Sequence, residues 1–86
     1  MYLHIGQGAV VRHESVIGIF DLDNTTSSHL TRSFLNGEEK AGRVVTLGDE
    51  LPKSFVLASE NGNNTVYLSQ LSPATISKRA ESNGLE

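Results

Sequence analysis

The sequence of 86 residues contains no cysteine, no tryptophan and only two prolines. The absence of cysteine excludes a disulfide framework, a thiolate metal site and a cysteine nucleophile. No apolar run approaches the roughly 20 residues that cross a bilayer. The segment Met1–His4 also lacks the basic start and apolar block of a signal peptide. We therefore expect a cytoplasmic protein without a membrane segment.

The charge balance is mildly acidic, with seven Lys and Arg against ten Asp and Glu and a net charge of −3. This balance argues weakly against non-specific nucleic-acid binding, although it is compatible with a local basic face. A chain of this size buries roughly 63% of the surface that it exposes when unfolded. Since no disulfide is available, a lone subunit should be only marginally stable, and association with further copies is the expected support.

Hydrophobic patterning predicts six strands and two helices in the order β-β-β-α-β-β-β-α. The segment 61–64, Asn-Gly-Asn-Asn, predicts a hairpin because these residues tolerate positive φ angles. Ser72 followed by Pro73 predicts the N-cap and first residue of a helix. The predicted strands are 2–5, 9–12, 16–20, 44–47, 54–59 and 65–70, and the predicted helices are about 27–41 and 74–80.

The longer predicted helix carries an apolar stripe of Leu30, Phe34 and Ala41, with Leu35 at its edge, the pattern of a helix that faces a core. Its weak point is Gly37, so the helix either ends there or continues to Gly42, a residue suited to a helix C-terminus. The charged segment 38–40 is expected to be a solvated face of this helix.

The predicted fold class is therefore α+β, with a small, mostly antiparallel sheet, one long helix and a short C-terminal helix. Residues 1–80 are expected to form a single domain. Residues 81–86 are expected to be a disordered tail, and its last two residues, Leu-Glu, are typical of a cloning scar.

One motif suggests an enzyme. Residues 19–25, Ile-Phe-Asp-Leu-Asp-Asn-Thr, resemble the first motif of haloacid-dehalogenase-type phosphatases, whose two carboxylates attack phosphorus, move a proton and hold Mg²⁺. Asp49 imitates a later acidic motif, but it follows Asp21 by only 28 residues. That spacing leaves room for one helix and one strand, and it favours Asp21 and Asp23 as a strand end and a helix cap. A phosphatase is a remote alternative, and we predict no catalytic residue, metal ligand or cofactor.

Four segments, taken together in their order and at this chain length, carry a second resemblance: 1–6, 19–26, 51–56 and 66–72. Over residues 1–80 the sequence resembles the RemA/RemB family of bacterial extracellular matrix regulators. The resemblance implies a LytTR-like fold and a ring-shaped homo-oligomer, a heptamer or an octamer, without catalysis. It further implies a regulator of biofilm matrix genes that binds DNA through its backbone.

Three cations are the predicted DNA contacts: Arg12, Lys53 and Arg43. RemA-type chains carry adjacent arginines where this sequence has Asp49 and Glu50. Since these acids replace charge that would bind phosphate, an alternative is a ring-forming partner or modulator of a RemA-type regulator that no longer binds DNA itself.

Overall fold

The computed structural model describes residues 2–22 and 29–85, and its elements follow the predicted order. Most of the polar segment 21–26, which is suited to capping a helix, and the expected start of the long helix at about residue 27 lie outside the described residues. The described elements are β1 (Tyr2–Gly6), β2 (Ala9–Arg12), the 3-10 helix η1 (His13–Ser15), β3 (Val16–Asp21), α2 (His29–Lys40), β4 (Val44–Thr46), β5 (Ser54–Glu60), β6 (Asn63–Ser69) and α3 (Pro73–Leu85).

A four-stranded sheet in the order β3-β5-β6-β4 forms the centre of the molecule, and β1 pairs with β2 in a separate sheet. The α+β class is confirmed, and most strand pairs are antiparallel, as predicted. The separate hairpin sheet and the parallel pairing of β4 with β6 were not predicted. The parallel orientation follows from α2, because a crossover helix brings the strands on either side of it into the same direction. The β5–β6 hairpin then lies between those two strands.

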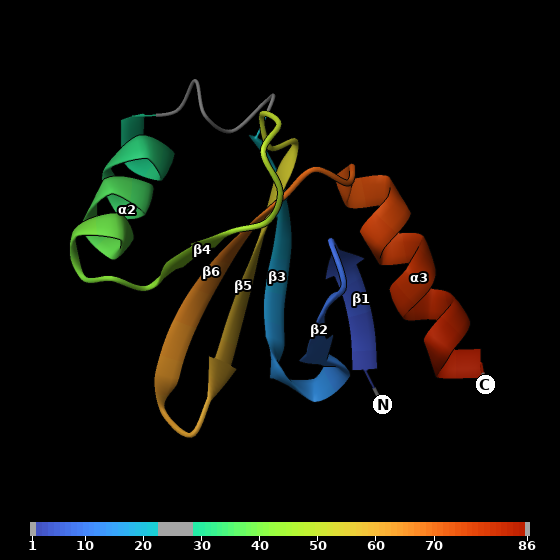
Figure 1. The fold of residues 1–86 in the computed structure, drawn as a ribbon. Coiled ribbons are helices and arrows are strands. Elements are labelled where there is room, and N and C mark those ends of the chain that lie inside the picture. Colours follow the sequence, from blue (N-terminus) through green and yellow to red (C-terminus); the bar gives the residue numbers. More distant parts are fainter. Residues whose placement is uncertain (1, 23–28, 86) are drawn as a thin grey trace.

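The two faces of the central sheet are covered unequally. On one face, which we call the hairpin face, the β1–β2 hairpin and α3 enclose the larger core cluster (Figure 1). On the opposite face, the α2 face, α2 lies beside β4 and covers a smaller cluster. The larger cluster contains Leu3, Ile5, Val11, Leu47, Val56 and Ile76, and the smaller contains Leu22, Phe55 and Val66.

Local signals correctly placed the β5–β6 turn and the start of α3. Asn61 and Gly62 have φ angles of 53° and 82°, as a two-residue hairpin turn of type I′ requires. Ser72 caps α3, since its Oγ accepts a hydrogen bond from the Thr75 N–H at 3.2 Å. The described helices have 12 and 13 residues, and neither has the length and apolar character needed to cross a membrane.

The predicted end of the C-terminal helix at Ala80 is wrong, because α3 continues to Leu85. The segment 81–85 is therefore helical in the structure and is not the irregular tail that its composition suggested. Serine, asparagine and glycine are weak helix formers, but a helix that is already nucleated gains one backbone hydrogen bond for each residue that it adds. Ala80 packs against the larger core cluster and anchors the preceding turns.

The C-terminal end of α2 is capped by backbone hydrogen bonds and stabilised by an ion pair. The Gly42 N–H donates to the Glu39 carbonyl and the Arg43 N–H to the Glu38 carbonyl, and Gly42 has a φ of +76°. This pair of bonds is a Schellman motif. Arg43 Nη2 also lies 2.6 Å from Glu38 Oε2. The predicted solvated face at 38–40 is therefore wrong for Glu38, which is only 7% exposed.

Two buried serines connect the sheet to its neighbours. The Ser69 hydroxyl donates to the Ile5 carbonyl at 2.6 Å and accepts from the Leu71 N–H at 3.1 Å. The Ser54 hydroxyl donates to the Leu71 carbonyl at 2.8 Å. These bonds satisfy buried backbone groups where β1 and the β6–α3 connection meet the sheet.

The first prediction concerns Ser69. Ser69→Ala removes both hydrogen bonds at a fully buried site, so we expect it to lower the free energy of unfolding by about 1–3 kcal/mol. Chemical denaturation followed by circular dichroism measures the change. Ser77→Ala, at an exposed site on α3, is the control and should change stability by less than about 0.5 kcal/mol. Equal effects of the two substitutions would contradict the role assigned to Ser69.

The second prediction concerns the ion pair. Arg43→Gln leaves the buried Glu38 carboxylate without its cation, so we expect a loss of about 1–3 kcal/mol, moderated because Arg43 is half exposed. Adding Glu38→Gln should recover part of this loss, since the buried charge is then removed. The same denaturation measurement applies, with Lys40→Gln as the control. A double variant no more stable than Arg43→Gln alone would refute this explanation.

Candidate functional site

The three cations predicted to contact DNA lie in different parts of the molecule. Arg12 ends β2 and lines one groove together with Glu60, at the end of β5. Lys53 precedes Ser54, at the opposite end of this seven-residue strand, about 20 Å away. Arg43 precedes β4 at the far edge of the sheet. The structure therefore does not bring the three cations together.

Carboxylates lie close to Arg12. Its Nη2 is 3.5 Å from Glu14 Oε2, and both side chains are more than half exposed, so this pair adds little stability. A hydrogen bond from its own backbone N–H lowers the pKa of the Glu14 carboxyl, and the positive charge of Arg12 lowers it further. Glu14 therefore remains ionised beside Arg12 and reduces the attraction that Arg12 offers to a phosphate.

Lys53 differs from the two arginines. Arg43 is engaged by Glu38 and Arg12 by Glu14, whereas Lys53 has no ion pair within the described residues. Its backbone is held on both sides, because its N–H donates to the Ser69 carbonyl at 2.8 Å and its carbonyl accepts from the Leu22 N–H at 3.0 Å. The Lys53 side chain is therefore exposed, while its backbone is fixed by hydrogen bonds at one end of the sheet.

The loop before Lys53, which contains the two acids, packs against Gln70. Gly48 has a φ of +84°, and a Cβ there would overlap the side chain of Gln70. The Gln70 Nε2 donates to the Glu50 carbonyl at 3.3 Å. Asp49 and Glu50 are both exposed. The loop therefore presents negative charge at the same end of the sheet as Lys53.

The phosphatase-like segment does not have the surroundings of that enzyme class. Asp21 ends β3, which is an edge strand and pairs antiparallel with β5, whereas the phosphatase motif belongs to a parallel α/β sheet. Asp23 lies outside the described residues. Within the described part of the chain, no three His, Asp or Glu side chains gather as metal ligands.

An exposed apolar surface, which sequence reasoning missed, lies between α2 and the sheet. Phe20, Leu30 and Phe34 are 38%, 78% and 40% exposed. The ring centroid of Phe55 lies 4.8 Å from that of Phe20 and 6.4 Å from that of Phe34. We call this surface the phenylalanine patch; its groove of about 290 Å³ is lined by Phe20, Leu30, Thr31, Phe34, Phe55 and Leu57.

The prediction that the stripe of Leu30 and Phe34 faces the core is therefore wrong. The helix is turned so that Leu35 packs on the smaller core cluster and Glu38 is buried, which leaves the stripe at the rim. Ala41 lies beyond the end of α2 and is exposed. In the sequence, the position of Glu38 beside the stripe was the available sign of a different helix orientation. The burial of Glu38 could not be predicted from that position alone, because it depends on the ion pair with Arg43, five residues further along the chain.

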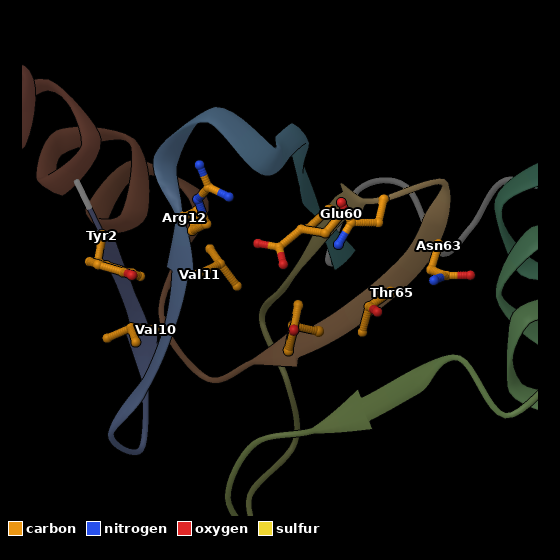
Figure 2. A pocket seen from close by; sticks show the side chains of 10 residues that line it. Tyr2, Val10, Val11, Arg12, Glu60, Asn63 and Thr65 are labelled. Carbon is orange, nitrogen blue, oxygen red and sulfur yellow. The ribbon is translucent and has the colours of Figure 1, made fainter.

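A second hollow, which we call the polar groove, lies between the β1–β2 hairpin and the turn end of β5 and β6. Its volume is about 550 Å³. Figure 2 shows Arg12 on β2 and the Glu60 carboxylate extending toward the same space. The lining residues are Tyr2, Val10, Val11, Arg12, Ala58, Glu60, Asn61, Asn63, Thr65 and Tyr67.

Comparison with known proteins bears on the role of this fold. The family model described as RemA-like, extracellular matrix regulatory protein A-like, matches residues 2–80. The chain is also similar to extracellular matrix regulatory protein B of Bacillus subtilis (strain 168), with 35% identity over 81 residues, which cover 94% of this chain and 91% of the relative. The resemblance inferred from the four sequence segments is confirmed. The chain belongs to the RemA-like family of extracellular matrix regulatory proteins.

Proposed function

We propose that this chain is a non-catalytic regulator of extracellular matrix genes, which acts as a closed ring of identical subunits with LytTR-like folds and binds the backbone of DNA. Its family supports the regulatory role. The observation that carries the assembly is the phenylalanine patch, which one subunit leaves uncovered. In a ring, weak contacts from each subunit add, because all of them act on one partner.

The phenylalanine patch is suited to contact between subunits. Exposed apolar surfaces of this kind mark interaction sites more often than isolated apolar residues do. A closed ring requires that the patch meet a different surface of the next subunit, since its contacts are head-to-tail. Ile17 on β3, which is 59% exposed and does not line the groove beside Arg12, offers such a surface.

We propose that Lys53 is the main phosphate contact. It is exposed, it has no ion pair among the described residues, and its backbone is fixed. Arg12 lies at the opposite end of β5, so one ring face would present Lys53 or Arg12 to the same DNA segment, but not both. Binding would depend on the number of subunits that touch the DNA, and its sequence preference would come from DNA shape, because phosphate contacts carry no base information.

A second candidate is a ring-forming partner of a RemA-type regulator that does not bind DNA itself. The observation that favours it is the held loop with exposed Asp49 and Glu50 beside Lys53. Two acids near one lysine make the local charge negative, which opposes phosphate binding and suits a basic protein surface.

The third prediction tests the assembly. Phe34→Asp places a charge in the phenylalanine patch, so we expect the assembled mass measured by light scattering to fall toward that of one subunit. Asn36→Asp, two residues away and about 200° around the helix, adds the same charge outside the patch and should leave the mass unchanged. An assembly that survives Phe34→Asp, or one that never forms in the parent protein, would reject the proposed contact.

The fourth prediction tests DNA binding by mobility shift at two salt concentrations. We expect Lys53→Gln to weaken binding and to lower the salt dependence by about 0.9 log units per decade of salt for each phosphate that is no longer neutralised. The control is Lys78→Gln, which removes an exposed cation on α3. If the parent protein gives no shift at low salt but co-purifies with a RemA-type relative, the second candidate replaces the first.

A further inference from the structure

We propose that the polar groove binds a small zwitterionic molecule of the amino-acid class. The groove is distinct from the phenylalanine patch and from the Lys53 end of the sheet. It presents one cation, Arg12, and one anion, Glu60, to the same space of about 550 Å³, a volume within the range of small-molecule sites. The way each charge is held, and the surface that lies between the two charges, favour such a ligand.

The anionic side of the groove is held in position. The Ser15 hydroxyl donates to Glu60 Oε1 at 2.8 Å, and Ser15 itself is buried at 8% exposure. The carboxylate therefore has one oxygen fixed by the protein, while the other is available to a ligand. The neighbouring Asn61 and Asn63 also line the groove, and their amide oxygens are further acceptors. Together they offer the acceptors that an ammonium group needs.

The cationic side belongs to Arg12. Its ion pair with Glu14 is long and exposed and uses one end of a guanidinium that has five N–H donors. Arg12 and Glu60 line one groove but form no ion pair with each other in the described structure. A ligand with a carboxylate and an ammonium group can satisfy both charges at once, whereas a phosphate would approach Glu60 and Glu14 unfavourably.

The remaining lining suits the carbon part of such a ligand. Val11 and Ala58 are 6% and 4% exposed and supply a buried apolar surface, and Val10 borders the same groove. Thr65 and Tyr67 add hydroxyl groups from β6. The combination of opposite charges with an aliphatic surface favours an amino acid with a short aliphatic side chain over a uniformly hydroxylated sugar.

Titrations of the 86-residue chain, followed by the shifts of its backbone amide resonances, test the proposal. The probes are L-valine, N-acetyl-L-valine, L-valinamide and glucose, each up to about 10 mM. We expect L-valine to shift the resonances of Arg12, Glu60 and Asn61. The N-acetyl derivative lacks the ammonium group and the amide lacks the carboxylate, so both should bind at least about tenfold more weakly.

Two variants assign the binding to the groove. Glu60→Gln keeps an acceptor for Ser15 but removes the charge, and Arg12→Gln removes the opposite charge at an exposed site; each should weaken L-valine binding at least about tenfold. Glu39→Gln, at an exposed site on α2, should bind like the parent protein. The proposal is overturned if L-valine shifts none of these resonances, if all three valine compounds bind equally, if glucose alone binds, or if both groove variants bind normally.

Discussion

The structure depends on one constraint: β5 is apolar on both sides, so the central sheet needs a cover on each face. The chain covers most of one face with the β1–β2 hairpin and α3, apart from the polar groove at the turn end of β5 and β6. For the other face it has one described helix, α2, which packs beside β4 and reaches only part of the sheet. The phenylalanine patch is the uncovered remainder. A small chain without disulfides thus keeps apolar surface exposed, and in our proposal a neighbouring subunit supplies the missing cover.

Glu38 explains why α2 covers so little. A helix that faces a sheet normally buries an apolar stripe, but this one buries a carboxylate and must neutralise it with Arg43. A buried charge requires a nearby partner, and that partner is Arg43, whose backbone N–H makes one of the two bonds of the Schellman motif. In this orientation of α2, Leu35 packs on the smaller cluster, Leu30 is 78% exposed, and Phe34 lies at the rim beside Phe55. Glu38 therefore takes part in the C-terminal cap of α2, and its burial accompanies the exposure of the phenylalanine patch.

Several signals that are local in the sequence were reliable, although the weak helix formers after Ala80 did not end α3. The Asn61-Gly62 turn, the Ser72 cap and the use of Gly42 after α2 were all predictable, because each depends on the φ preference or hydrogen bonding of a few neighbouring residues. The parallel β4–β6 pair and the burial of Glu38 were not predictable. Both depend on contacts between elements, namely the path of a crossover helix and the arrival of Arg43 beside a specific carboxylate.

The candidate sites show the same limit. The predicted DNA contacts were chosen for their charge and for the neighbouring loops: Arg12, Lys53 and Arg43. How strongly each cation attracts a phosphate also depends on nearby carboxylates, which only the fold brings close. Two of the three proved to be ion-paired. The polar groove could not be predicted from neighbouring residues, since Glu60 and Arg12 belong to strands that lie far apart in the sequence.

The proposed DNA contact and the proposed ligand site lie at opposite ends of β5. Lys53 lies at the Ser54 end, whereas Arg12 and Glu60 lie at the turn end. A ligand in the groove would therefore not touch the Lys53 end directly. Arg12 directly precedes η1, and Ser15, the last residue of η1, donates a hydrogen bond to Glu60, so η1 connects both charged residues of the groove. Any influence of a ligand on DNA binding would have to pass through η1 and β5 or through the contacts between subunits, because Lys53 is not among the residues that line the groove.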